Sequence, residues 1–373
     1  MADAITGASR YGVLDRLLHR LAFVHPCLQR VLADIENDLF KKRLADVRVE
    51  RPVFVVGLPR AGTTLVLELL YGTGEFASFT YRQMPFVLNP LLWDRISAGS
   101  RQASVELERA HGDAMSIGHD SPEAFEEVLW MNELASAIFD GNTMRTLGPE
   151  DLTDAFRDAY RRLAAKIVCL ASPVGGVAAG GVEPENDRPP RYLSKNNANV
   201  ARLPAIASVF EDATLLCCFR DPAAHVASLH SQHCRFLDMH DDDAFAERYM
   251  AWIGHHDFGR NFRPIRFTED PPSTASPTEP VFWLRYWLDA YRHVLRSAPP
   301  QTVFVRFEDL LANGAATLGR LGQRLGLADI EALVAATSTL RAPTSKPASL
   351  AHLSPALADE ADALLGELRA RAV

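Results

Sequence analysis

A loop bounded by two glycines is the first part of the sequence whose residue types could do chemistry. Gly57-Leu-Pro-Arg-Ala-Gly62-Thr63-Thr64 has the spacing of a nucleotide phosphate loop, G-x-x-x-x-G-K-[ST], but Thr63 replaces the lysine. The glycines allow backbone N–H groups to face a phosphate, and a helix beginning near Gly62 would direct its positive end at it. Because Arg60 is the nearby cation, the loop suits a single 5′-phosphate that carries one transferable anionic group. An ordinary glycine turn between a strand and a helix is the alternative.

The segment Val56-Gly-Leu-Pro-Arg-Ala-Gly-Thr-Thr-Leu65 resembles the 5′-phosphosulfate loop of sulfotransferases, which use 3′-phosphoadenosine 5′-phosphosulfate (PAPS). The bacterial and tyrosylprotein-type members carry Pro-Arg-Ser-Gly-Thr-Thr, so Ala61 stands where they have serine. The resemblance implies that the chain binds this donor without a metal, through the loop residues Arg60, Ala61, Gly62, Thr63 and Thr64.

A second phosphate motif follows the apolar run at 213–219. Arg220 ends this run and Ser228 comes eight residues later, which is the spacing of the family's 3′-phosphate motif. Arginine offers a fork of donors to a phosphate, and Ser228 can add a hydroxyl. Lys346 is a further candidate, because a late basic loop like 341–346 closes over the donor's 3′-phosphate in this family.

Lys195 ends a short predicted strand between the two phosphate motifs. It is similar to the family's strand-end lysine, which reaches the bridging oxygen or the sulfuryl group. A lysine there would stabilise charge that develops on the sulfuryl oxygens and the leaving phosphate, a task shared with Arg60. A solvated lysine in a loop is the alternative.

The catalytic base is harder to assign. The tyrosylprotein branch has a glutamate shortly before Arg-x-x-Pro, and here Thr80 takes that place before Arg82 and Pro85. A base must accept the proton of the acceptor hydroxyl, so a carboxylate or a histidine in a partly dry cleft qualifies. Residues 118–127 supply four candidates, of which we expect the first two to rank highest: Glu126, His119, Glu123 and Glu127. Glu123 and Glu127 are expected on one helix face, and acids that merely stabilise a helix N-terminus are the alternative.

Apolar runs and helical periodicity predict the elements that position these residues. Buried strands are expected at 52–57, 191–195, 213–219 and 302–307, and helices at 10–46, 63–70, 101–139, 150–170 and from 222 onward. This alternation predicts an α/β fold, a P-loop-like three-layer α/β/α arrangement with a central, mainly parallel sheet and the ligand at the carboxyl ends of its strands. We expect one sulfotransferase-like domain over residues 1–373, with a helical N-terminal extension at 1–50 and a Pro-rich loop insertion at 264–280.

The composition argues against several classes of protein. The 373 residues are 47 % hydrophobic and 23 % charged, which is typical of globular proteins, and the net charge of −8 argues against a nucleic-acid partner. No secretory signal or transmembrane segment is recognisable, and the five cysteines lack paired zinc spacing, so a cytoplasmic location is expected. A cluster on one predicted helix is not a compact metal-ligand set, and solvated or cleft-lining histidines are expected instead: His225, His230, His233 and Cys234.

The expected reaction transfers a sulfuryl group from PAPS to an acceptor hydroxyl. A carbohydrate, a lipid-linked sugar, a peptide tyrosine or a small metabolite could supply this hydroxyl. A P-loop kinase or NTPase is one alternative, although Thr63 in place of lysine argues against it. A non-catalytic nucleotide-binding protein is the other, suggested by Thr80.

Overall fold

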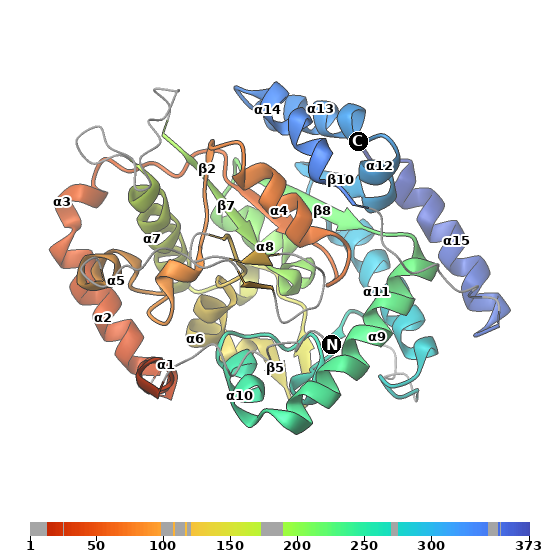
Figure 1. Cartoon of the computed structure of the whole chain (residues 1–373), viewed down its shortest axis with the longest axis horizontal. Coiled ribbons are helices and arrows are strands. Elements are labelled where there is room, and N and C mark those ends of the chain that lie inside the picture. The colour runs from red at the N-terminus through yellow and green to blue at the C-terminus, as the bar shows by residue number, and fades with distance from the viewer. Residues whose placement is uncertain are drawn as a thin grey trace.

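The computed structural model describes residues 13–24, 26–97, 107–108, 116–117, 121–172, 189–269, 275–341, 350 and 352–373. Within these residues, the central sheet has five strands in the order β10-β8-β1-β7-β2, and all its neighbouring strands are parallel (Figure 1). The strands are β1 (Val53–Val56), β2 (Phe76–Ala77), β7 (Arg191–Lys195), β8 (Thr214–Phe219) and β10 (Thr302–Arg306). The predicted parallel sheet is confirmed, because four of these strands coincide with predicted apolar runs.

Alternate residues of the sheet face two different layers of helices. Val53 and Val55 of β1 pack in a cluster that includes α4 (Thr63–Tyr71), α12 (Phe307–Ala312), α13 (Gly314–Leu325) and α14 (Ile330–Ala335). Phe54 and Val56 pack in a second cluster that includes α6 (Glu127–Ile138), α7 (Asp154–Ala171), α8 (Leu203–Val209), α9 (Pro222–Asp242), α11 (Pro280–Ser297) and α15 (Pro355–Arg369). Because successive side chains of a strand point to opposite faces, the two clusters lie on opposite sides of the sheet. The fold is the three-layer α/β/α arrangement that the sequence predicts.

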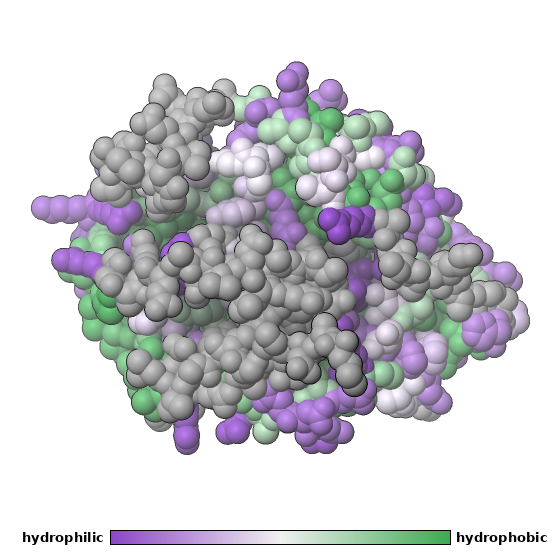
Figure 2. Space-filling view, in the orientation of Figure 1, coloured by the Kyte–Doolittle hydropathy of each residue, from purple (hydrophilic) through white to green (hydrophobic). Residues whose placement is uncertain are grey.

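Three N-terminal helices lie along the left edge of Figure 1: α1 (Val13–Val24), α2 (Pro26–Leu39) and α3 (Lys41–Leu44). A buried ion pair fixes α2 to α7, with Lys166 Nζ 2.6 Å from Glu36 Oε2. Burial raises the pKa of Glu36 and lowers that of Lys166, while the attraction between them opposes both shifts. The exposed large apolar side chains of the described residues all lie in α1, α2 and α5 (Pro90–Ser97), and Figure 2 shows apolar surface at this left rim: Leu17, Leu21, Val31, Ile35, Leu39 and Ile96.

The remaining elements are short. An antiparallel pair joins β3 (Leu107–Glu108) to β4 (Ser116–Ile117), and a small second sheet contains β5 (Phe139–Asp140), β6 (Thr143–Arg145) and β9 (Ile265–Arg266). Helix α10 (Ala244–Trp252) follows α9 along the chain. The described residues also form short 3-10 helices: η2 (Tyr81–Gln83), η4 (Pro149–Asp151), η5 (Asn197–Ala201), η6 (Gly259–Asn261) and η7 (Ala336–Thr339). None of the described helices is both long and apolar enough to cross a membrane.

The helix predicted over 101–139 is wrong in its first part. Its described residues include β3 and β4, and residues 121–126 are not helical, so the helix begins only at Glu127. The reason is a pairing with a distant segment: Thr80 forms an antiparallel bridge with Pro122, and the Glu123 amide donates to Phe79 O over 2.9 Å. Glu123 and Glu127 therefore do not share a helix face.

Candidate functional site

The glycine loop leaves β1 in a conformation that side chains rarely adopt. Gly57 has φ +143°, and a Cβ there would lie 2.4 Å from the Cys218 carbonyl oxygen. Gly62 has φ +91°, and a Cβ there would lie 2.6 Å from the ring of Phe307. Arg60, between them, also has a positive φ of 69°. Since α4 begins at the next residue after Gly62, the loop is held tightly between β8 and the helix whose N-terminus can face an anion.

Helix α9 contacts this loop at two neighbouring residues. Arg60 Nε donates to Ser228 Oγ over 3.1 Å, and His225 Nε2 lies 2.8 Å from Pro59 O. Burial, followed by the charges of Arg220 and Arg60, lowers the pKa of His225 to about 3 despite the bond to Pro59. The imidazole is therefore neutral, and its Nε2–H donates to the carbonyl. His225 is a fully buried support of the loop, and the expectation of a solvated or cleft-lining residue is wrong for it.

Arg220 extends from the end of β8 toward the same loop. Its side chain is 10 % exposed, its Nε lies 3.8 Å from Glu308 Oε1, and its guanidinium lies 4.9 Å from the centre of the Phe307 ring. Burial lowers the pKa of Arg220, but an arginine remains charged in proteins. Phe307 thus contacts both Arg220 and the backbone at Gly62, and it brings the two phosphate motifs together.

Lys195 ends β7 and pairs in register with Val55 of β1, directly before the glycine loop. Its Nζ lies 4.0 Å from Glu123 Oε1, and both side chains are nearly fully buried. Glu123 Oε1 also accepts from the Ala124 amide over 2.8 Å, and Glu123 Oε2 accepts from the Tyr81 hydroxyl over 2.8 Å. The structure therefore brings Lys195 to the glycine loop at residues 57–62, which we call the predicted donor loop, and a carboxylate to Lys195.

Two of the predicted base candidates, Glu126 and Glu127, have buried partners in the core. The two carboxylate oxygens of Glu126, which is fully buried, accept from Tyr192 Oη over 3.0 Å and from Asn199 Nδ2 over 2.8 Å. Both carboxylate oxygens of Glu127 accept from the buried guanidinium of Arg202, over 2.6 and 2.8 Å. These contacts join the start of α6 to β7 and to the segment after it. His119 and Lys346, the other predicted site residues, lie outside the described residues.

Two hydrogen bonds in series connect Thr63, the first residue of α4 after the glycine loop, to a pocket. Thr63 Oγ1 donates to Asn197 Oδ1 over 3.2 Å, and Asn197 Nδ2 donates to Asp257 Oδ2 over 3.1 Å. Burial raises the pKa of Asp257, and the charge of Lys195 is among the influences that lower it. Sequence reasoning missed Asp257, because it belongs to no motif and follows a helix rather than a strand of the central sheet.

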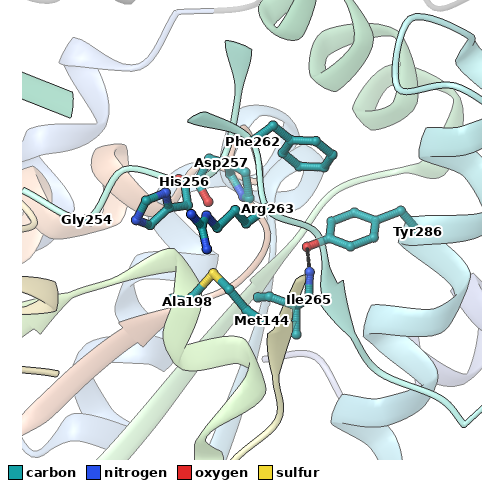
Figure 3. A pocket seen from close by; sticks show the side chains of 10 residues that line it. Met144, Ala198, Gly254, His256, Asp257, Phe262, Arg263, Ile265 and Tyr286 are labelled. Carbon is teal, nitrogen blue, oxygen red and sulfur yellow. Dashed lines mark hydrogen bonds between the residues drawn. The ribbon is translucent and has the colours of Figure 1, made fainter. Parts of the chain in front are cut away.

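Figure 3 shows this pocket, which Pro59 of the donor loop also lines. His256, Asp257 and Arg263 gather on one side of the view, and Tyr286 lies on the other with its hydroxyl accepting from the Ile265 amide over 3.2 Å. Phe262, Met144 and Ile265 add apolar surface. The lining therefore offers a carboxylate, a guanidinium and apolar groups beside the donor loop. No group of three or more histidine, cysteine or acidic residues able to hold a metal occurs in the described part of the chain.

Taken together, a glycine loop with Thr63 in place of the lysine lies at the carboxyl edge of a parallel sheet, with cations at the ends of β7 and β8, and this is the arrangement by which α/β proteins bind anionic ligands. The chain belongs to the sulfotransferase family, whose pattern matches residues 52–269. This match includes β1, the glycine loop, β7, β8 and α9. The protein is therefore a sulfotransferase, as the loop motif predicts.

Solved structures of sulfotransferases resemble the chain at low sequence identity. Sulfotransferase STF1 from Mycobacterium tuberculosis H37Rv is 14 % identical with a TM-score of 0.48, over 95 % of this chain and 87 % of that one. Sulfotransferase STF9 from Mycobacterium avium is 14 % identical with a TM-score of 0.47, over 88 % and 81 %. The sulfotransferase domain from the curacin biosynthetic pathway is 14 % identical with a TM-score of 0.36, over 86 % and 98 %. None of the curated proteins matches the sequence significantly.

Proposed function

We propose that the protein transfers the sulfuryl group of PAPS to an acceptor hydroxyl. The observation that carries this proposal is the contact between Arg60 and Ser228, which joins the 5′-phosphate loop to the helix that follows Arg220. The donor has an anionic group at each end of its ribose. Arg60 and the amides of residues 61–64 would hold the 5′-phosphosulfate, while Arg220, Ser228 and Lys346 would hold the 3′-phosphate.

In the proposed reaction the acceptor oxygen attacks sulfur in line with the leaving 5′-phosphate. Negative charge grows on the sulfuryl oxygens and on the bridging oxygen, where fixed cations stabilise the transition state more than the ground state. Lys195 and Arg60 supply these cations. Three features of Lys195 support this role: it is buried, it pairs with Val55 just before the glycine loop, and its ammonium lies near the Glu123 carboxylate.

The pocket beside Pro59 and Asp257 is our candidate for one part of the acceptor site, and the space around Lys195, whose charge acts on Asp257, is the other part. The cavity has room for about one water molecule, so it would admit the hydroxyl of an acceptor rather than the whole molecule. Carbohydrates, lipid-linked sugars, peptide tyrosine and small metabolites all carry such a hydroxyl and stay within the proposal. Transfer of the labelled sulfuryl group from radiolabelled PAPS to a panel of these acceptors would identify the class of acceptor.

Calorimetry with 3′-phosphoadenosine 5′-phosphate tests the donor. We expect binding of this product and much weaker binding of ATP, because Thr63 replaces the lysine that ATP-binding loops use. The Arg220→Gln variant should lose charge-assisted hydrogen bonds of about 1.5–3 kcal/mol in total, or about 10- to 150-fold in affinity. Arg324→Gln is the matched control, since Arg324 is exposed on α13. ATP binding without binding of the 3′-phosphorylated nucleotide would refute the proposed donor.

A further inference from the structure

The pairing of residues 79–80 with residues 122–123 puts a carboxylate beside the position where the sequence lacks one. Thr80 is buried, and its hydroxyl is occupied locally: it accepts from the Arg82 amide over 3.4 Å and donates to Gln83 Oε1 over 3.1 Å. The Thr80–Pro122 bridge places Glu123 next to it along the paired segment. We propose that Glu123 is the catalytic base of the transfer, an assignment that rests on the proposed function.

Contacts around Glu123 favour an ionised carboxylate close to the reacting group. The Lys195 ammonium at 4.0 Å and the donors from Tyr81 and Ala124 all stabilise the negative form. Lys195 is also the cation next to the donor loop, because it pairs with Val55. A sulfuryl group within reach of this ammonium is therefore near the carboxylate as well.

The proton and electron balance of the step is simple. The O–H bond of the acceptor breaks and its proton passes to a Glu123 carboxylate oxygen, while the acceptor oxygen forms a bond to sulfur. The bond between sulfur and the bridging oxygen breaks, and its electron pair stays on the leaving 5′-phosphate. Lys195 and Arg60 stabilise the charge on that phosphate, and Glu123 leaves the step as a neutral carboxylic acid.

The other carboxylates near the site have different tasks. Glu126 is fully buried and bonds Tyr192 and Asn199 in the core, whereas Glu123 lies beside the Lys195 ammonium. Protonation of Glu127 would leave the charge of Arg202, which is 1 % exposed, without its buried counter-ion. Asp257 accepts from Asn197, which in turn accepts from Thr63, so it positions the donor loop.

The test compares Glu123→Gln with Glu211→Gln, a carboxylate-to-amide change at an exposed turn before β8. Nucleotide binding is measured by calorimetry with 3′-phosphoadenosine 5′-phosphate. Turnover is measured as label released from radiolabelled PAPS to water, and to any acceptor found in the panel, between about pH 5 and pH 9. We expect Glu123→Gln to bind the nucleotide within about twofold of the unchanged protein, to lose roughly 10²- to 10⁴-fold in kcat, and to lose the acid limb of the pH profile.

A second variant separates catalysis from a structural role. Tyr81→Phe removes the hydroxyl that donates to Glu123 Oε2. Because this bond stabilises the charged form, its loss should move the acid limb of the pH profile to higher pH while kcat at high pH changes little. A purely structural glutamate would not move that limb.

The outcomes distinguish the two levels of the proposal. If the unchanged protein does not bind the nucleotide, the proposed function fails. If the nucleotide binds but Glu123→Gln and Glu211→Gln turn over at equal rates, the assignment of Glu123 is overturned. The same conclusion follows if the unchanged protein binds the nucleotide but releases no label, since a base at the sulfuryl group should also activate water.

Discussion

Arg60 Nε donates to Ser228 Oγ over 3.1 Å, so a residue of the glycine loop is bonded to a residue two turns inside α9. The two are 168 positions apart in the sequence. Each was expected to hold a different phosphate of the donor. Their contact joins the two predicted halves of the donor site, so a shift of either residue would disturb the other.

A double-mutant cycle measures this connection. Arg60→Lys keeps the positive charge but lacks the Nε–H donor, and Ser228→Ala removes the acceptor. Each single change should weaken binding of 3′-phosphoadenosine 5′-phosphate by about 0.5–1.5 kcal/mol, the usual net value of one hydrogen bond. Groups in direct contact are also expected to show a coupling energy of about 0.5–3 kcal/mol. Strictly additive losses in calorimetry would mean that the contact does not contribute to donor binding.

Gly62 should not tolerate a side chain. Gly62→Ala places a methyl group 2.6 Å from the Phe307 ring at a φ of +91°. We expect a loss of about 1–3 kcal/mol in the free energy of unfolding, together with weaker nucleotide binding, because Phe307 also contacts Arg220. Gly366→Ala in α15 is the control: no atom lies within 4 Å, and alanine should stabilise the helix by about 0.5–1 kcal/mol. Equal thermal stability of the two variants would contradict the tight packing at Gly62.

Two glutamates of α6 allow a buried and an exposed ion pair to be compared. Glu127→Gln weakens the pair with Arg202, whose side chain is 1 % exposed, whereas Glu133→Gln breaks a pair with Arg30, whose side chain is 51 % exposed. We expect a loss of about 3–5 kcal/mol in the free energy of unfolding for the first change, and about 0.2–1 kcal/mol for the second. Chemical denaturation of both variants provides the measurement. A small effect at Glu127 would show that Arg202 finds another partner.

His225 should make the protein sensitive to acid. Its folded-state pKa of about 3 lies below the ordinary value of 6.5, so between these values the unfolded chain binds a proton that the folded chain does not. The free energy of unfolding is therefore unaffected by this group above about pH 6.5 and falls as the pH decreases, by about 2 kcal/mol at pH 5.

His225→Gln tests this effect, since the amide can still donate to Pro59 O but does not titrate. Between these pH values, the variant should take up about one proton fewer on unfolding than the unchanged protein, so its free energy of unfolding should depend less steeply on pH. His233 and His293, whose pKa values burial also lowers to about 4, should keep the remaining slope. An unchanged slope in the variant would indicate that His225 is not the neutral support of the loop.

Local sequence patterns were sufficient to predict four of the five strands of the sheet, all but the short β2, and the glycine loop. Continuous apolar runs such as Val53–Val56 identify strands that are buried on both faces, and a glycine spacing identifies a backbone that approaches a phosphate. Lys195 was placed correctly beside the loop because parallel strands end at the same edge.

The acid-bearing segment was harder to predict because its structure depends on a distant partner. Residues 121–126 pair with residues 79–80 and do not form a helix, and this pairing leaves no periodic signal in the sequence. The sequence analysis ranked Glu126 ahead of Glu123 and put Glu123 and Glu127 on one helix face, whereas Glu123 precedes the helix and lies beside Lys195. Asp257 escaped prediction for a related reason, since its contact with Asn197 spans 60 positions.

The amide of Asn197 is bonded on one side to Thr63 of the donor loop and on the other to Asp257 in the wall of the pocket. A ligand that displaces Asp257 must therefore disturb the orientation of this amide and, through it, Thr63. If the proposed donor and acceptor sites lie at the two ends of these bonds, we expect binding at one to change the affinity of the other, and thermodynamic linkage makes such an effect equal in both directions. The two substrates are then expected to bind interdependently, and Asp257→Asn should uncouple their affinities.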